Sequence, residues 1–111
     1  MNPCDYSLCT HTVTVYRREK TGIFRQVLEG CFFDRKGVFR DTETGAVLSR
    51  PFLLILPADR GSIRLRDWIC PGVGPEVSPE DWKRLVPELF QVRQCTPRYF
   101  QGELCHWEAE G

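Results

Sequence analysis

The sequence has no long hydrophobic run, and this absence excludes several classes of protein. No stretch of its 111 residues approaches the roughly 20 consecutive apolar residues that cross a bilayer. The opening "MNPCDYSLCTHTVTVY" also lacks the basic start and the unbroken apolar segment of a secretory signal. We therefore expect a soluble, intracellular protein that makes no contact with a membrane.

The chain also has no excess of charge of either sign. Fifteen basic and fifteen acidic side chains cancel to a formal net charge of zero, so no overall field attracts the chain to nucleic acid or to anionic lipid. The basic residues form three short groups: Arg17, Arg18 and Lys20; Arg35 and Lys36; Arg60, Arg64 and Arg66. Acidic residues are interleaved with each group, which favours a solvated surface or ion pairs between subunits. Arginines lining a ring around DNA remain an open alternative.

Paired cysteine motifs are also absent. The six cysteines are Cys4, Cys9, Cys31, Cys70, Cys95 and Cys105, and no two of them have the C-x2-C spacing that is typical of zinc sites. Without an export signal we expect reduced thiols that serve as small core residues. A metal site formed by Cys4, Cys9 and His11 is the one exception left open.

Groups suited to catalysis are few. The chain has only two histidines, His11 and His106. Cys105 precedes His106, and neighbours in a strand point to opposite faces, so these two side chains do not form a nucleophile and base pair. The "CPGVGP" segment at 70–75 lacks the further glycine and the helix start of a phosphate-binding loop. We expect neither an enzyme nor a bound cofactor.

What the chain does contain indicates a globular β protein. Hydrophobic residues make up 41% and aromatic residues 12% of the composition, which separates the chain from disordered proteins. A length of 111 residues is typical of one domain. We expect a single β-rich domain over residues 1–111, with 1–9 as a flexible N-terminal segment.

Three segments are typical of long or buried strands. Residues 10–16, "THTVTVY", alternate apolar and polar side chains. Residues 23–33, "IFRQVLEGCFF", continue this pattern, and Gly30 inside them indicates a bulge that curves the strand. Residues 52–57, "FLLILP", form a short apolar run bounded by prolines, which predicts the central buried strand.

The remaining strand predictions lie around these three. Residues 34–51 predict a hairpin that projects as an arm around the polar turn "DTETG". Residues 62–72, "SIRLRDWICPG", predict a strand that ends at proline and glycine. The last hairpin is predicted from 89–95 and 103–108, with "TPRYFQG" at 96–102 as its turn.

One helix is predicted in "SPEDWKRLVPE" at 78–88. Ser78 suits the N-cap position, Pro79 suits the first helical position, and Pro87 ends the helix within about nine residues. The whole pattern predicts a mainly all-β fold, a small barrel or sandwich of about six to seven strands with one short helix. Three tryptophans are expected to anchor it: Trp68, Trp82 and Trp107.

Five segments, taken in order, carry a family resemblance: "VTVY", "VLEGCFFD", "LLILP", "RDWICPG" and the terminal "HWEAEG". The last is close to His-Trp-Glu-Val and is the most specific of the five. Together they resemble a family of small proteins of unassigned function from tailed phages and prophages of Gram-positive bacteria. The chain departs from the family at "RDW", where a glycine is usual, and in the helix before the last hairpin.

The resemblance implies a structural role in virion assembly. Genes of the family lie among those for head-to-tail connection and minor capsid proteins, which implies a head-completion subunit of the stopper or joining kind. The implied partners are portal, connector and tail proteins, and the implied state is a homo-oligomeric ring, with a monomer in isolation left open. The implied locations are the bacterial cytoplasm during assembly and the finished virion.

Two loops are the expected contact or channel regions, and their candidate residues are Arg35, Lys36, Arg40, Asp41, Glu43, Asp59 and Arg60. The alternative function is a nucleic-acid-binding module of the OB or SH3-like kind. Its stacking platform would be Phe24, Phe32, Phe33 and Trp68. Any contact with DNA is expected to be independent of base sequence.

Overall fold

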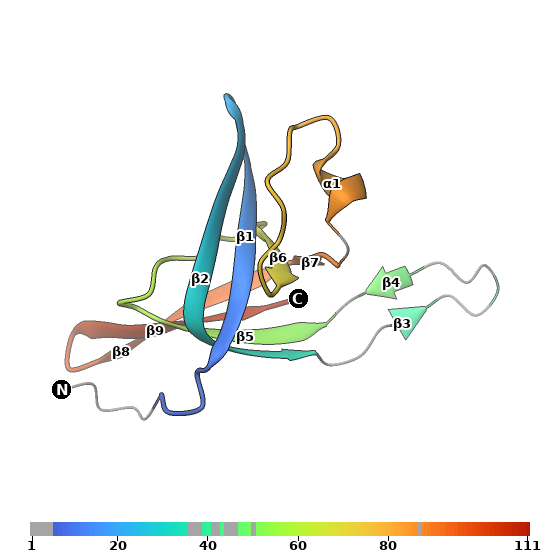
Figure 1. Ribbon diagram of the computed structural model, residues 1–111. Coiled ribbons are helices and arrows are strands. Elements are labelled where there is room, and N and C mark those ends of the chain that lie inside the picture. Colours follow the sequence, from blue (N-terminus) through green and yellow to red (C-terminus); the bar gives the residue numbers. More distant parts are fainter. Residues whose placement is uncertain (1–5, 36–38, 41–42, 44–46, 50, 87) are drawn as a thin grey trace.

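The computed structural model describes residues 6–35, 39–40, 43, 47–49, 51–86 and 88–111. This part of the chain forms strands and one short helix (Figure 1). In chain order they are β1 (His11–Glu19), β2 (Gly22–Arg35), β3 (Phe39–Arg40), β4 (Val47–Ser49), β5 (Phe52–Pro57), β6 (Trp68–Pro71), α1 (Trp82–Leu85), β7 (Phe90–Gln91), β8 (Gln94–Phe100) and β9 (Glu103–Glu110). The predicted fold class, mainly β with one short helix, is confirmed.

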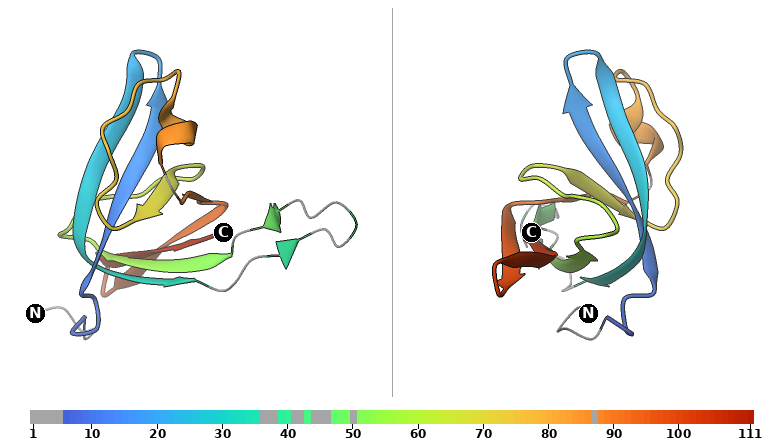
Figure 2. Two further views of the ribbon diagram at one scale, coloured as in Figure 1. Left: turned by 45° about the vertical axis from the view of Figure 1, so that its right-hand side comes forward. Right: turned by 90° about the vertical axis from the view of Figure 1, so that its left-hand side faces the viewer.

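Seven of the strands form one antiparallel sheet in the order β7-β6-β1-β2-β5-β9-β8. The sheet curls into a half-barrel, with the β1–β2 hairpin rising above β5, β9 and β8 (Figure 2). Its two edge strands, β7 and β8, follow each other in the chain. The backbone between them contacts both sides of the sheet opening. Val92 N–H donates at 2.8 Å to the carbonyl oxygen of Asp67, which precedes β6, and Arg93 N–H donates at 2.8 Å to that of Glu110, the last residue of β9.

A bend in β2 lets one long strand serve two parts of the sheet. Its first half pairs with β1, and its last four residues pair with β5. The register between β1 and β2 shifts between His11 and Val13, opposite Gly30, whose φ is +71°. Glycine adopts this left-handed conformation without a steric penalty, and the predicted bulge is confirmed.

The main core lies inside the curl of the sheet. β5 is an interior strand, as predicted from its apolar run, and Phe52, Leu54 and Leu56 on it are buried. Phe52 packs against Phe33 and Phe90 with ring centroids 5.8 and 5.6 Å apart. The buried members of this cluster are Val13, Val15, Leu28, Cys31, Phe52, Leu54, Leu56, Ile63, Ile69, Phe90, Val92 and Ala109.

A second, smaller cluster covers the outer face of β1. Tyr16 packs there with Cys70, Trp82 and Val86. The loop after β6 is fastened over this face, since the Thr14 hydroxyl donates to Gly72 O at 2.8 Å and the Tyr16 hydroxyl donates to Pro75 O at 2.8 Å. Both faces of β1 are therefore buried, although its alternating sequence predicts only one.

Two predicted elements are longer than the observed ones. The strand predicted over 62–72 is only β6, because Arg66 has a φ of +71° and the residues before it form a turn. The helix predicted from Ser78 starts at Trp82, because the Ser78 hydroxyl binds the Asp81 carboxylate at 3.0 Å and not a helical N–H. Residues 79–81 form the turn that precedes the helix.

The last hairpin differs from the prediction in the opposite sense. Residues 96–102 were expected to be its turn, but Thr96–Phe100 pair with β9 as part of β8. The turn is limited to Gln101 and Gly102, which both have positive φ angles. Pro97 lies within β8, an edge strand, where its missing N–H breaks no ladder on the outer side.

β3 and β4 form a separate two-stranded sheet, so the hairpin predicted in 34–51 is confirmed. It lies away from the seven-stranded sheet, beyond the ends of β2 and β5 (Figure 1). The predicted turn "DTETG" is described only at Glu43, which is exposed. Its other residues lie outside the described part of the chain.

Candidate functional site

The residues expected to form contacts are divided between the two ends of β5. Arg35, Arg40 and Glu43 belong to the end where the β3–β4 hairpin leaves the sheet. Asp59 and Arg60 form the turn at the other end of β5. Lys36 and Asp41 lie outside the described residues, and of Arg40 only the backbone, within β3, is described.

Arg35 is already engaged by a partner within the chain. Its guanidinium donates two hydrogen bonds to the Glu88 carboxylate, at 2.7 and 3.2 Å, and this contact raises the pKa of Arg35. The pair connects the end of β2 to the segment between α1 and β7. Arg35 is therefore engaged within the chain and is not a free contact residue.

The turn after β5 is much more open. The Asp59 side chain is 80% exposed, and its carboxylate lies 3.8 Å from the Arg60 guanidinium. Arg60 extends over the bend of β2, where a Cβ on Gly30 would lie 3.0 Å from its Nε. These two residues share a shallow pocket with Val27 and Glu29.

The three tryptophans lie in the two clusters. Trp82 is buried, and half-buried Trp68 packs against it edge to face with ring centroids 5.7 Å apart. Trp107 is half-buried and packs against the main core, between Leu56 on β5 and Pro97 on β8.

The cysteines and histidines offer little for metal binding or nucleophilic attack. His11 Nδ1 accepts a hydrogen bond from Phe33 N–H at 3.0 Å, and Cys4 lies outside the described residues. In the part of the chain that is described, no three cysteine, histidine or acidic side chains are grouped as metal ligands. Burial raises the pKa of the Cys31 thiol to about 12, which keeps this sulfur from acting as a thiolate nucleophile.

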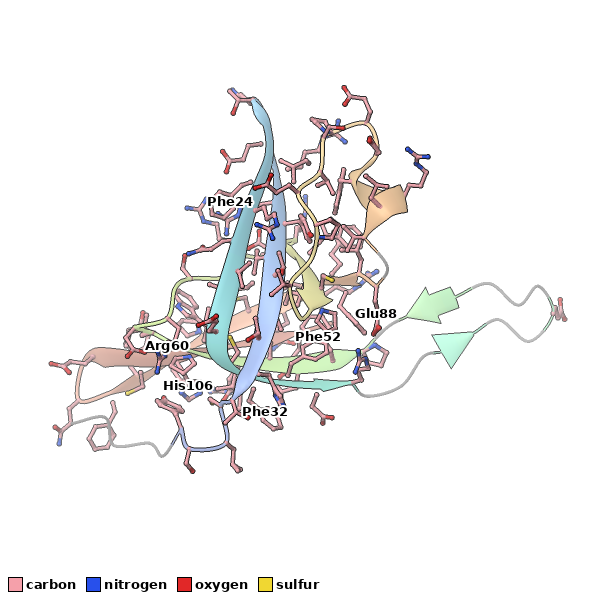
Figure 3. The ribbon with its side chains drawn as sticks, viewed as in Figure 1. Phe24, Phe32, Phe52, Arg60, Glu88 and His106 are labelled. Atoms are coloured by element: carbon pink, nitrogen blue, oxygen red, sulfur yellow. The ribbon has the colours of Figure 1, made fainter. Side chains whose placement is uncertain are left out.

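The aromatic side chains expected as a stacking platform do not share a face. Phe24 lies high on β2 and Phe32 at the lower end of the sheet (Figure 3). Phe33 packs in the main core and Trp68 packs in the second cluster. A nucleic-acid site built on these four rings does not form.

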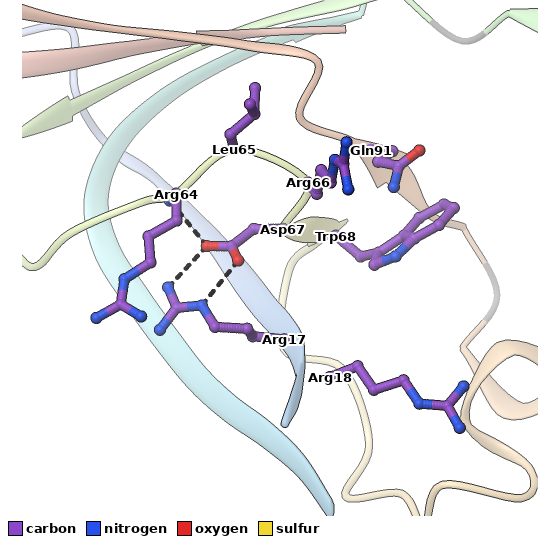
Figure 4. Close-up of a pocket in the computed structure, with 8 residues that line it drawn as sticks. All are labelled: Arg17, Arg18, Arg64, Leu65, Arg66, Asp67, Trp68 and Gln91. Carbon is purple, nitrogen blue, oxygen red and sulfur yellow. Dashed lines mark hydrogen bonds and ion pairs between the residues drawn. The ribbon is translucent and has the colours of Figure 1, made fainter. Parts of the chain in front are cut away.

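The structure instead brings arginines from two of the sequence groups into one place. A pocket of about 310 Å³ opens near the C-terminal end of β1, and we call it the arginine pocket. It is lined by Arg17, Arg18, Arg64, Leu65, Arg66, Asp67, Trp68 and Gln91 (Figure 4). The sequence placed Arg17 and Arg64 nearly 50 residues apart in separate groups, and no local pattern links them.

Asp67 organises the arginine pocket from beneath. Its side chain is 2% exposed and accepts hydrogen bonds from Arg17 Nε and Nη2, both at 2.8 Å. Arg64 N–H donates to the same carboxylate at 2.9 Å. The hydrogen bonds to Asp67 raise the pKa of Arg17. From the sequence, Asp67 was predicted to be one of several surface acids interleaved with the arginines. Its burial could not be predicted, because it depends on the turn that forms around it.

A second pocket of about 320 Å³ lies beneath the N-terminal segment. It is mostly apolar and is lined by Tyr6, Leu8, Cys9, Phe32, Ile55, His106 and Glu108. His106 Nε2 is 3.1 Å from the Glu108 carboxylate and His106 Nδ1 is 2.6 Å from the Tyr6 hydroxyl. In the neutral imidazole, Nε2–H donates to the carboxylate, which can only accept, and the Tyr6 hydroxyl donates to Nδ1. His106 therefore fastens residues 6–9 to β9.

Comparison of the chain with protein-family models, with curated proteins and with solved structures finds no match. Among the described residues, no helix is long and apolar enough to cross a membrane. The features that bear on function are therefore those of the molecule itself, above all the separate β3–β4 hairpin, the exposed Asp59–Arg60 turn and the arginine pocket.

Proposed function

We propose that this protein is a structural subunit of a phage or prophage virion, of the head-tail connector or head-completion kind. It acts through protein–protein contacts and carries out no catalysis. Its partners are further copies of the chain in a ring, together with portal or tail proteins, during assembly in the bacterial cytoplasm and in the virion. The ordered resemblance that ends in "HWEAEG" supports the viral origin, and the β3–β4 hairpin supports the mode of action.

The hairpin is the observation that carries the proposal. β3 and β4 have two and three residues, and they pair only with each other. A two-stranded hairpin of this size is at best marginally stable alone in water. It gains stability when another protein covers it, which is what a connecting arm between subunits requires.

The distribution of contact loops fits a ring. A ring requires two different, complementary surfaces on each subunit. The hairpin lies at one end of β5 and the exposed Asp59–Arg60 turn lies at the other. Separate surfaces at the two ends of one strand allow each subunit to contact two neighbours.

The test is replacement of residues 39–49 by a Gly-Ser linker of equal length. We expect an unchanged melting temperature, because the hairpin adds no strand to the main sheet. We expect self-association, measured by multi-angle light scattering, to be lost. Co-purification with a portal-proximal protein should be lost as well. Exchange of Lys20 and Thr21, at the tip of the β1–β2 hairpin, for glycine and serine is the matched control. If the variant with the linker assembles as well as the control variant, the proposed role of the β3–β4 hairpin is contradicted.

The viral assignment has its own test in the order of genes. We expect the neighbouring genes to encode capsid, portal and tail proteins. A neighbourhood without such genes would remove the viral assignment, whatever the light scattering shows.

A further inference from the structure

We propose that the arginine pocket binds phosphate groups of a nucleic acid strand, through Arg18, Arg64 and Arg66, without reading base sequence. The site is distinct from the β3–β4 hairpin and does not depend on the proposed assembly role. It also differs from the aromatic platform that the sequence predicts, because guanidinium groups and not exposed rings make the contact.

Unpartnered positive charge is the first argument. Asp67 is fully occupied by Arg17 and by the backbone of Arg64. The side chains of Arg18, Arg64 and Arg66 are exposed, and in the described part of the chain none of them forms an ion pair. The lining of the arginine pocket thus holds four arginines and one aspartate, and this excess of positive charge attracts an anion.

The turn that carries the arginines is held in a fixed shape. Arg66 has a φ of +71°, a conformation that a residue with a side chain keeps only when its surroundings impose it. Here Arg66 N–H donates to Val92 O at 2.8 Å, and buried Asp67 holds the turn from the other side. Figure 4 shows the Arg64 and Arg66 side chains extending to different sides of Asp67. A rigid turn presents its donors with little loss of entropy on binding.

The positive surface continues beyond the pocket. Trp68 lines the arginine pocket, and Lys83 Nζ from α1 lies 4.7 Å from the centroid of its ring. Arg84, the next residue of α1, is also exposed. Cations contributed by β1, by the turn before β6 and by α1 match the repeated charges of a phosphodiester backbone better than they match a single small anion.

The donor types decide the ligand class. Arginine binds phosphate oxygens through two parallel hydrogen bonds, and it keeps its charge at all physiological pH values. Lys83 covers one face of Trp68, which removes that face as a platform for a base. The arginines therefore supply the contacts of this site, and because these contacts go to phosphate oxygens, every sequence is bound about equally.

The experiment is fluorescence anisotropy with a labelled single-stranded DNA of mixed sequence and with its duplex, over a series of salt concentrations. We expect binding at low salt, and we expect the logarithm of the binding constant to fall linearly with the logarithm of the salt concentration. Arg64→Gln and Arg18→Gln each lower the affinity about tenfold and reduce the salt slope by about one. Arg98→Gln is the matched control, since Arg98 lies exposed on β8 beside Glu108 and does not line the arginine pocket, and it leaves binding unchanged.

Three results would overturn the proposal. The first is no binding at low salt, and the second is an equal effect of Arg64→Gln and Arg98→Gln. The third is competition by inorganic phosphate or adenosine monophosphate as strong as that by unlabelled DNA, which would assign the pocket to a free phosphate. Melting temperatures of the variants exclude unfolding as the cause. Light scattering on the same variants separates this site from assembly, because Arg18→Gln leaves self-association intact.

Discussion

Asp67 is a buried carboxylate that joins two segments of the chain by three hydrogen bonds. It binds the guanidinium of Arg17 on β1 and the backbone of Arg64 in the turn before β6. The Arg17 side chain is largely buried as well, at 17% exposed. When one member of a buried ion pair is removed, the other is left without compensation in a poor solvent for charge. Asp67 thus supports both the fold and the shape of the arginine pocket.

The residue-scale prediction is the effect of Asp67→Asn. The amide keeps the shape of the side chain but leaves the Arg17 guanidinium without its counter-charge. We expect the free energy of unfolding to fall by about 3 kcal/mol, measured by urea denaturation at neutral pH. Asp59→Asn is the control, because Asp59 is 80% exposed, and it changes stability by less than about 0.5 kcal/mol. Equal effects of the two substitutions would show that the buried pair contributes nothing.

At the scale of elements, β9 is the strand that completes the lower part of the sheet. It pairs with β5 on one side and with β8 on the other. Cys105 and Ala109 are buried, and Trp107 packs against the main core. The chain end is also attached directly, since Gly111 N–H donates to Phe52 O at 3.4 Å.

We predict that removal of residues 104–111 unfolds the protein. The deletion leaves two strands without their partner and exposes the lower part of the core, and loss of the Trp107 contact alone costs about 2 to 3 kcal/mol. Circular dichroism should show loss of the β signal and of the cooperative melting transition. A truncated chain with the melting temperature of the full chain would instead identify this end as a tail that docks on a partner.

At the scale of the whole molecule, one chain of polar contacts joins the N-terminal segment to the last hairpin. It runs from Tyr6 through His106 to Glu108, and the Glu108 carboxylate also accepts a hydrogen bond from Arg98 on β8 at 3.0 Å. The hydrogen bond to His106, and then the one to Arg98, lower the pKa of Glu108. Segments 100 residues apart in the sequence thus depend on one carboxylate.

This lowered pKa predicts a stability that depends on pH. The contribution of Glu108 is fully present above the ordinary pKa of 4.5 and is lost as the pH falls through the lower pKa of the folded state. Urea denaturation at pH 7 should show Glu108→Gln less stable than the natural chain by about 0.5 to 1 kcal/mol. This difference should shrink as the pH falls below 4.5 and vanish once the pH lies below the pKa of Glu108 in the folded state. Glu103→Gln, exposed on the same strand, is the control, and a difference that persists in acid would contradict the pKa argument.

The features predicted correctly from the sequence depend on local pattern. Alternation in "THTVTVY" predicted β1, the apolar run "FLLILP" between two prolines predicted β5, and Gly30 predicted the bend in β2. Alternation failed over 62–67, because Arg66 adopts a left-handed conformation in a turn that hydrogen bonds to Val92 and within residues 64–67 hold in place. The helix start at Ser78 failed because its hydroxyl has a competing partner in Asp81.

The sequence by itself determined the fold class, most of the strands and the absence of net charge. The strands follow from side-chain periodicity over a few residues, and the net charge follows from the composition of the whole chain. Tertiary structure alone decided which charges meet. Arg17 and Arg18 come beside Arg64 and Arg66 only because β1 pairs with β6, and Asp67 becomes buried only when both segments close over it. Electrostatic sites depend on distances in space, and pairing between strands far apart in the chain sets those distances.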